Sequence, residues 1–458
     1  MWARDNINTM GRTTQTTTHT AAHGTRRWTR LWLPGLIGLA FVAGLGKAIT
    51  RPVAAPFQPP PNAKGAAASL GATGLQTRFV STSAGPHRHA GSLVELGDGR
   101  IRAFWFSGSR EGAADVEIRS ALFDPGLSRW AEDAPVIDRK RTQAGVLRHI
   151  RKLGNPVAVR VPDGRLHLFY VTVSVGGWAG SSISMITSND EGKTWGPARR
   201  LITSPFIKIS TRVKGTPILY ANGDIGLPVY HEFLGKFGEL LRLDASGKIL
   251  DKQRLSYGYS TLQPVVLVRD AARAQVLMRA AGAISQNKVI GTSTADAGRH
   301  WAAAEKTTLS NPGSAVSGVA LPDGSLLAVV NDLDANRDSL SLVASTDGGK
   351  RWRTLLKLED QLHWKEGELT EAQFTIEADK LAQATDAALQ DPPGLVRAAR
   401  AHQCAQQRCN FEFSYPYLIR IANGDIHLVY TWNRSAIKHV AFSRAWVEAR
   451  IKGAGAAP

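Results

Sequence analysis

Cysteine and acidic side chains are scarce in this chain. Its 458 residues include two cysteines, Cys404 and Cys409, and 38 aspartates and glutamates against 56 lysines and arginines. Two cysteines so close together are more typical of a local disulfide in an exported protein than of a metal pair. The sequence also lacks zinc-type and phosphate-loop motifs, and it lacks the interleaved aromatic and basic residues of nucleic-acid modules. We therefore expect no metal, no cofactor and no nucleic-acid partner.

The shortage of acidic residues leaves a formal net charge of +18. Part of this excess lies in the first 30 residues, which are polar, rich in threonine and basic. The remaining positive charge favours an acidic ligand through electrostatic steering. A generic basic surface with no meaning for a ligand is the alternative.

Long apolar runs are scarce as well, and the only one is found at residues 31–49. It extends for about 16 residues before Lys47, which is short for a spanning helix unless that lysine snorkels to the interface. Because basic residues precede it, we expect 1–30 to be a cytoplasmic leader and 31–49 to be an inner-membrane anchor with the rest periplasmic. A cleaved signal peptide, and hence secretion, is the alternative. Residues 50–72, rich in Pro, Ala and Gly, are expected to form a linker.

The strongest positive signal is a repeated box. Residues 188–195, 294–301 and 345–352 all contain Ser or Thr, then Asp, Gly and Trp at the same spacing, and degenerate copies occur at 124–130 and 243–247. A repeat unit of about 51–53 residues fits this spacing if one box has decayed. We expect the Asp to accept backbone N–H bonds, the Gly to adopt a conformation closed to other residues, and the Trp to pack between sheets. The boxes are therefore expected to build the fold and not the active site.

A second repeat lies out of phase with the boxes. Six segments consist of a hydrophobic run, a tight polar turn and another hydrophobic run: 92–106, 157–171, 218–230, 265–280, 318–330 and 418–432. Most turns carry Asp-Gly or Asn-Gly, which favours two-residue hairpins with both central residues at positive φ. The flanking runs have the composition of strands.

Together, the two repeats predict an all-β fold. We expect a six-bladed β-propeller over 73–452, preceded by the N-terminal anchor helix. The segment 362–410 breaks the blade pattern and has helical composition, so it predicts a short helical insertion that ends at Pro392-Pro393. This insertion either shapes one rim of a pocket or is a plain decoration.

The repeat also predicts where ligands bind, because propellers place them over the central channel, near the starts of the innermost strands. Counting back one strand length from each hairpin turn gives six positions that can hydrogen-bond: His89, Asn155, Thr216, Gln263, the region of Ser314, and Tyr415. Several are followed by proline, which is tolerated at the beginning of a strand. Polar strand starts that are satisfied by neighbouring loops are the alternative reading.

The loops after the hairpins add charged side chains to the same mouth. They contribute Arg110, Glu111, Asp115, His231, Arg279, Arg337 and Arg434. The guanidinium fork of arginine matches the two oxygens of a carboxylate. Glu111 or Asp115 is a candidate general acid if it is buried beside apolar groups.

These motifs resemble the sialidase (neuraminidase) superfamily, in particular bacterial sialidase-like proteins with Asp-box (BNR) repeats, over about residues 75–450. The resemblance implies three arginines for a substrate carboxylate, a Tyr nucleophile paired with a Glu, and an Asp acid/base. By residue, Tyr415 is similar to the nucleophile, Arg279 to the second arginine, and Asp115 or Glu111 to the acid/base.

Three places depart from the pattern of that superfamily. His89 stands where the first arginine is expected, and Gln263, which cannot take a proton, stands where the glutamate is expected. Arg337 and Arg434 are both candidates for the third arginine. Tyr415 would then need another base, such as His231 or Glu232.

The expected function is hydrolysis of a terminal acidic sugar, sialic acid or a related one, from a glycan. Tyr415, Glu111, Asp115 and His231 are the predicted catalytic residues. The predicted substrate-binding residues are His89, Arg110, Asn155, Gln263, Arg279, Arg337 and Arg434. Two alternatives stay open: a different carbohydrate hydrolase or lyase acting on uronic-acid glycans, and a glycan-binding propeller without catalysis.

Overall fold

The chain forms two compact units in a computed structural model, Met1–Val53 and Ala54–Pro458. The structure describes residues 25–49, 54–59, 70, 74–81, 87–203, 210–365, 367–386, 389 and 391–453. The first unit contains helix α1 (Thr25–Ile49). In the described part of the chain, no helix combines the length and apolar character that crossing a membrane requires. The predicted anchor at 31–49 is thus helical but is not confirmed as a span, and the predicted leader lies mostly outside the described residues.

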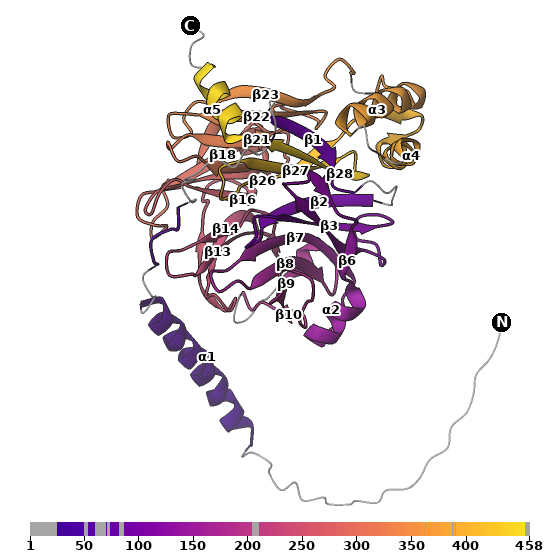
Figure 1. The fold of residues 1–458 in the computed structure, drawn as a ribbon. Helices are drawn as coiled ribbons and strands as arrows, with labels where there is room; N and C mark the ends of the chain where they lie inside the picture. Colours follow the sequence, from indigo (N-terminus) through magenta and orange to yellow (C-terminus); the bar gives the residue numbers. More distant parts are fainter. Residues whose placement is uncertain are drawn as a thin grey trace, which may run out of the picture. The chain divides into compact units, whose positions relative to one another are not determined.

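The second unit is a β-propeller of six sheets (Figure 1). Blade 1 contains β2 (His87–Glu95), β3 (Ile101–Gly108), β4 (Glu117–Asp124), β5 (Arg129–Trp130) and β6 (Ala134–Ile137). Blade 2 contains β7 (Lys152–Arg160), β8 (Leu166–Val173), β9 (Ser181–Ser188) and β10 (Arg199–Arg200). Blade 3 contains β11 (Thr211–Val213), β12 (Ile218–Leu219), β13 (Ile225–Glu232), β14 (Lys236–Leu243) and β15 (Ile249–Arg254).

The other three blades repeat this antiparallel arrangement. Blade 4 contains β16 (Thr261–Val268), β17 (Ala274–Ala280), β18 (Lys288–Thr294) and β19 (Glu305–Ser310). Blade 5 contains β20 (Ser317–Ala320), β21 (Leu326–Val330), β22 (Ser339–Ser345) and β23 (Arg353–Asp360). Blade 6 contains β26 (Phe413–Arg420), β27 (Ile426–Trp432), β28 (Ala436–Phe442) and β1 (Leu75–Phe79). The predicted six-bladed fold is confirmed.

The ring is closed within blade 6. Strand β1, from the beginning of the propeller, pairs antiparallel with β28, near its end, from Leu75↔Phe442 to Phe79↔Lys438. Contacts between neighbouring blades run from β2 to β7, β7 to β11, β13 to β16, β16 to β20, β20 to β26, and from β26 back to β2. The innermost strands therefore surround one central channel.

The predicted boxes have the expected geometry. In the first, the Asp190 carboxylate accepts the Thr194 backbone N–H at 2.8 Å, and the Ser188 hydroxyl accepts the Gly192 N–H at 2.8 Å. The corresponding glycines of the three boxes, Gly192, Gly298 and Gly349, have φ of 84°, 79° and 91°, where a Cβ would be strained. The boxes thus stabilise turns, as the sequence predicts.

The hairpin turns differ from the prediction of two-residue loops. In blade 1 the Leu96 N–H donates to Arg100 O, and the Gly99 N–H donates back to Leu96 O. Gly99 has positive φ, whereas Asp98 does not, and the same holds for the Asp-Gly and Asn-Gly pairs of blades 2, 3, 5 and 6. These loops therefore have three residues, with glycine alone in the left-handed position.

The helical insertion is confirmed, but its internal boundary was predicted wrongly. Helix α3 (Glu371–Thr385) begins with a capping box formed by Thr370 and Gln373. Pro392-Pro393 does not end a helix; it opens helix α4 (Pro392–Gln403), whose N-cap is Asp391. Proline is favoured there because the first helical residues need no N–H partner. Strands β24 (Cys404–Ala405) and β25 (Arg408–Cys409) follow, and the Cys404–Cys409 disulfide joins them.

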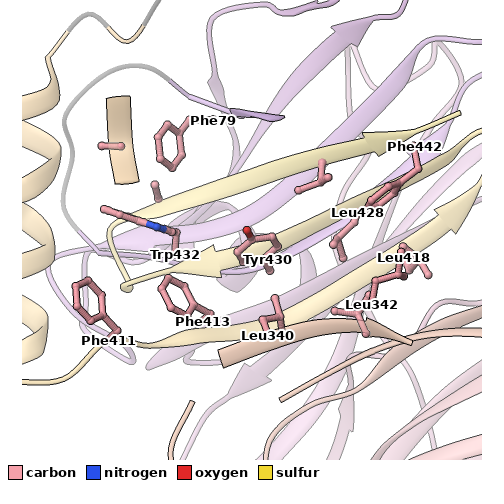
Figure 2. Close-up of a cluster of buried hydrophobic side chains, with 14 of the residues drawn as sticks. Phe79, Leu340, Leu342, Phe411, Phe413, Leu418, Leu428, Tyr430, Trp432 and Phe442 are labelled. Atoms are coloured by element: carbon pink, nitrogen blue, oxygen red, sulfur yellow. The ribbon is translucent and has the colours of Figure 1, made fainter. Parts of the chain in front are cut away.

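The insertion belongs to the hydrophobic core and is not a plain decoration. Phe374 of α3 is fully buried and stacks on Phe411, with ring centroids 4.7 Å apart. These rings continue the cluster between blades 5 and 6 that includes Phe79, Phe413 and Trp432 (Figure 2). Two further helices, α2 (Arg139–Val146) and α5 (Arg444–Gly453), were not predicted.

Part of the predicted linker lies against the propeller. Phe57 is fully buried and packs on Tyr220 of blade 3 at 5.3 Å between ring centroids. Its backbone N–H donates to Ala271 O in the blade 4 turn, and the Gln58 N–H donates to Leu219 O. Within 50–72 the structure describes residues 54–59 and Leu70, and the others lie outside the described residues.

Candidate active site

Four of the innermost strands share a bulge close to their starts. The pairing register shifts across Ala90-Gly91, Asn155-Pro156, Gln263-Pro264 and Tyr415-Pro416. The first residue of each pair has φ between 45° and 55°, a left-handed conformation that costs a non-glycine residue free energy. Bulges re-aim side chains, and strain repeated at one channel mouth is a reason to look for function there.

Three of the six predicted mouth positions, Asn155, Gln263 and Tyr415, occupy these bulges. The prediction for blade 1 is displaced by one residue, because Ala90 and not His89 occupies the equivalent place. His89 instead lies beside the bulge, and its ring centroid is 4.3 Å from that of Tyr415. Spacing alone could not separate two adjacent residues.

A buried lysine lies behind Tyr415. The Lys214 Nζ is 5.6 Å from the Tyr415 ring centroid and 4.9 Å from the Tyr417 ring centroid, and it donates to Pro416 O at 3.2 Å. Lys214 is buried, and this burial lowers its pKa to about 7. A neutral amine is therefore accessible to this side chain near neutral pH.

His89 is neutral at physiological pH. Burial lowers its pKa well below the usual value, and its Coulomb interactions with His87, Arg434, Arg337 and Lys214 act in the same direction. Among the described residues, its Nδ1 is buried and has no hydrogen-bond partner. His89 can therefore accept a hydrogen bond, but it cannot supply the fixed positive charge expected of an arginine.

Arg279 and Gln263, from adjacent strands of blade 4, contact each other. The Arg279 Nη1 donates to Gln263 Oε1 at 3.2 Å. On the neighbouring blades, the Asn155 amide donates to the Tyr230 hydroxyl at 3.3 Å. Burial raises the pKa of Tyr230 to about 12, so this phenol stays protonated. Over blades 2 and 4 the mouth thus offers neutral donors beside the Arg279 guanidinium.

Arg337 and Arg434, the two candidates for the third arginine, share one carboxylate. Glu412 lies 2.6 Å from Arg434 Nε and 3.4 Å from Arg337 Nη1, and it accepts the Ser414 hydroxyl at 2.8 Å. Burial acts to raise the pKa of Glu412, but Arg434 and Arg337 outweigh it and hold this pKa below the usual value. Glu412 is therefore an anion that orients the two arginines.

The two predicted acids have different surroundings. Asp115 is exposed and accepts both the backbone N–H (2.8 Å) and the hydroxyl (3.0 Å) of Ser109. Although its slight burial acts the other way, these hydrogen bonds lower the pKa of Asp115. Glu111 is half-buried and lies 3.8 Å from Arg434, next to the Tyr415 side of the mouth.

Two other predicted residues lie away from Tyr415. Arg110 is exposed in the same loop as Glu111. The His231 ring stacks on Phe237 at 4.9 Å, and no contact between His231 and Tyr415 is found among the described residues. Glu232, the other suggested base, forms an ion pair with Arg212.

The opposite end of the channel contains a cavity of about 280 Å³. Residues toward the C-terminal ends of the innermost strands line it, such as Val94, Arg160 and Val268. Thr216 also lines it, as does Gln58 from the linker segment that packs against blade 3. Apart from Thr216, the predicted mouth residues do not line this cavity.

In the described residues, no group of three or more His, Cys, Asp or Glu side chains can hold a metal ion.

Sequence reasoning missed Lys214 and Glu412. Lys214 lies two residues before Thr216, in the sequence Lys-Gly-Thr-Pro. Counting back one strand length from the turn selected Thr216 and did not reach Lys214. Glu412 lies just before β26 and three residues before Tyr415, at the end of the insertion. A search for charged residues immediately before each innermost strand would have found Glu412, whereas Lys214 lies between the two short inner strands of blade 3.

A family model described as a BNR repeat-like domain matches residues 99–428. The chain belongs to this family. The predicted BNR repeats are confirmed. No curated protein matches it closely enough to be counted as a relative.

Solved structures similar to this BNR repeat-like protein share its fold at low identity. The Hadza microbial sialidase Hz136 has a TM-score of 0.57 at 14% identity, with 78% of this chain and 66% of that chain covered. The intramolecular trans-sialidase of Ruminococcus gnavus has a TM-score of 0.55 at 11% identity, with 83% and 98% covered. A protein of unknown function from Dyadobacter fermentans has a TM-score of 0.57 at 13% identity, with 81% and 99% covered.

Proposed function

We propose that this protein is an exo-glycosidase that hydrolyses a terminal acidic sugar, sialic acid or a related one, from a glycan. The observation that supports this most is the left-handed bulge that presents Tyr415 at the channel mouth, beside His89 and Lys214. Sialidases use a tyrosine nucleophile in place of the usual carboxylate. The solved relatives include a sialidase and a trans-sialidase.

In the proposed reaction the substrate carboxylate binds to Arg279, Arg337 and Arg434. Arg337 and Arg434 are already oriented by Glu412, so little side-chain entropy is lost when the substrate binds. The Tyr415 oxygen attacks the anomeric carbon, and the bond to the leaving oxygen breaks. Water then attacks the same carbon and releases the sugar from Tyr415.

Two proton transfers accompany the attack. The Tyr415 proton needs an acceptor, and the amine of Lys214, whose pKa is about 7, is the basic group next to the ring. The leaving oxygen needs a proton donor. Glu111 suits this role better than Asp115, because the hydrogen bonds from Ser109 favour the ionised form of Asp115.

The test is turnover of a fluorogenic sialoside by the full-length protein. Tyr415→Phe and Arg279→Ala are each expected to lower kcat/KM by about 10²–10⁴-fold, because each removes a group that acts at the reacting centre. Tyr220→Phe is the control: it removes the hydroxyl of another buried tyrosine, which packs against Phe57 on blade 3, and it should leave turnover unchanged. Absence of wild-type turnover on every sialic or related ulosonic acid substrate would contradict the proposal.

A non-catalytic glycan-binding protein is the second candidate. It is favoured by Gln263, which cannot act as a base, and by the neutral His89 at the place of a cation. Binding on a glycan array without any product would select it. Activity on uronic-acid polysaccharides that is lost in His89→Ala would instead select the remaining alternative, a different hydrolase or lyase.

A further inference from the structure

Four planar side chains form a continuous stack on the rim of blade 3. The His231 ring stacks on Phe237 with centroids 4.9 Å apart and planes 21° apart. The Arg254 guanidinium lies over two aromatic rings, 4.1 Å from the Phe237 centroid and 4.7 Å from the Tyr257 centroid. We call His231, Phe237, Arg254 and Tyr257 the rim ladder.

The rim ladder begins beside the candidate active site. His231 directly follows Tyr230, whose hydroxyl accepts the hydrogen bond from Asn155 at the channel mouth. Successive side chains of a strand point to opposite faces, so Tyr230 faces blade 2 while His231 faces the ladder. The Arg212 guanidinium, 5.2 Å from the Tyr230 centroid, forms an ion pair with Glu232 on the same strand. The ladder therefore continues the site outward over blades 3 and 4.

The outer end of the rim ladder is open to solvent. Tyr257 lies in the loop between β15 and β16 and is 69% exposed. Phe233 and Leu234, in the loop between β13 and β14, are 53% and 77% exposed. A stack that served only to hold the blade together would bury its last ring, because burial of an aromatic face is the source of its stabilisation.

The chemistry of the rim ladder matches an acidic saccharide. The C–H face of a pyranose is apolar and stacks on an aromatic ring such as Tyr257. Arg254 donates its Nε to Ser256 O at 2.7 Å. Glu239 is its cross-strand neighbour and interacts with it electrostatically, but among the described residues it forms its ion pair with Lys252. The Arg254 guanidinium fork is thus available to a carboxylate of the sugar that stacks beside it.

We propose that the rim ladder binds the sugar units next to the one that is cleaved, and that it prefers units with a carboxylate. The position of these units relative to the cleaved bond rests on the proposed function. The binding itself does not, because an acidic oligosaccharide would bind to the ladder in a protein without catalysis as well.

The first experiment measures binding in the Tyr415→Phe background, where turnover cannot remove the ligand. The probe is a sialic acid tetramer, studied by titration calorimetry with the full-length chain. Tyr257→Ala and Arg254→Ala are each expected to raise Kd about 10-fold. Trp446→Ala is the matched control, since Arg450 stacks on Trp446 at 5.0 Å in helix α5, and it should leave Kd unchanged.

Equal Kd values for parent, Tyr257→Ala and Arg254→Ala, with unchanged circular dichroism, would overturn the proposal. Arg254→Lys separates the two parts of the idea, because lysine keeps the charge but loses the planar fork. We expect a Kd between those of the parent and Arg254→Ala. A neutral oligosaccharide of the same length should bind equally to the parent and to Arg254→Ala.

The second experiment separates the rim ladder from the proposed hydrolysis. In the active protein, Tyr257→Ala should lower kcat/KM about 10-fold for the tetramer and leave it unchanged for an aryl sialoside, which has no inner sugar. If the parent protein turns over neither substrate and Tyr257→Ala weakens tetramer binding, the rim ladder is supported and the proposed hydrolysis is refuted. Unchanged kcat/KM on both substrates refutes the ladder and leaves the hydrolase standing.

Discussion

The two ends of the propeller channel handle charge in different ways. At the hairpin-turn end, aspartates pair with an arginine two or three positions along the chain, as in Asp98–Arg100, Asp163–Arg165 and Asp270–Arg273. At the mouth, the charged contacts join distant segments, such as Arg337 with Glu412 and Lys214 with Tyr415. Short-range pairs stabilise turns one at a time, whereas the long-range contacts depend on the whole ring.

The comparison predicts its largest effect at Glu412. Glu412→Gln keeps the shape of the side chain but leaves Arg434 and Arg337 without their shared carboxylate. Both guanidiniums are only partly buried and Arg434 keeps Glu111 at 3.8 Å, so we expect the free energy of unfolding to fall by about 2–3 kcal/mol. Urea denaturation measures it, with the exposed Glu368→Gln as the control. A loss below about 1 kcal/mol would mean that the mouth tolerates isolated charge as the surface does.

One buried pair of histidines near the turn end is an exception, because its two members come from different strands. His427 Nδ1 and His439 Nε2 are 3.0 Å apart, and the Trp130 indole N–H donates to His439. Burial lowers the pKa of His427 to about 3, and it also lowers that of His439. Both imidazoles are thus neutral in the folded protein, but they would accept protons in the unfolded chain below its pKa of about 6.5.

The sign of the resulting pH dependence follows from this difference. The unfolded state binds more protons below pH 6.5, so stability is complete above that pH and is lost as the pH falls toward the folded pKa. From pH 6.5 to pH 5, His427 alone should account for about 2 kcal/mol of lost unfolding free energy. His427→Gln should flatten this slope in denaturant titrations at several pH values. The same slope in His427→Gln and in the exposed His149→Gln would rule out this source.

The smallest effect is expected at the hairpin turns. Asp98 and Arg100 form an exposed ion pair at 2.6 Å, and Asp98→Asn removes its charge. Exposed pairs contribute little, so the unfolding free energy should change by about 0.5 kcal/mol or less. Thermal unfolding at two salt concentrations would show it. A loss as large as that of Glu412→Gln would erase the distinction between the two ends.

The sequence predicted the regular part of this molecule well because that part is local. A turn glycine such as Gly99, or a box such as 188–195, needs only its neighbours in the chain to form. The same repeat located Asn155, Gln263 and Tyr415 at the mouth. It failed by one residue at His89, since two adjacent residues differ only in which one occupies the bulge.

The site chemistry was harder to predict because it depends on contacts between distant segments. Lys214 becomes notable only because Tyr415 and Tyr417, about two hundred positions later, cover it. Glu412 is notable because it meets Arg337 from blade 5 and Arg434 from blade 6. His231, a predicted catalytic residue, belongs instead to a stack with Phe237. Local spacing contains no information on which distant side chains face each other.

The closure of blade 6 has a consequence for the order in which the protein becomes competent during synthesis. Strand β1 is synthesised before the other strands of the propeller, but its partner β28 (Ala436–Phe442) is synthesised after them. Tyr415 lies on the blade that contains this seam, and its neighbour His89 lies on blade 1. A nascent chain therefore contains every predicted catalytic side chain before it can assemble the site. We expect any glycan-directed activity to switch on in one step, when the last strand is released and the ring closes.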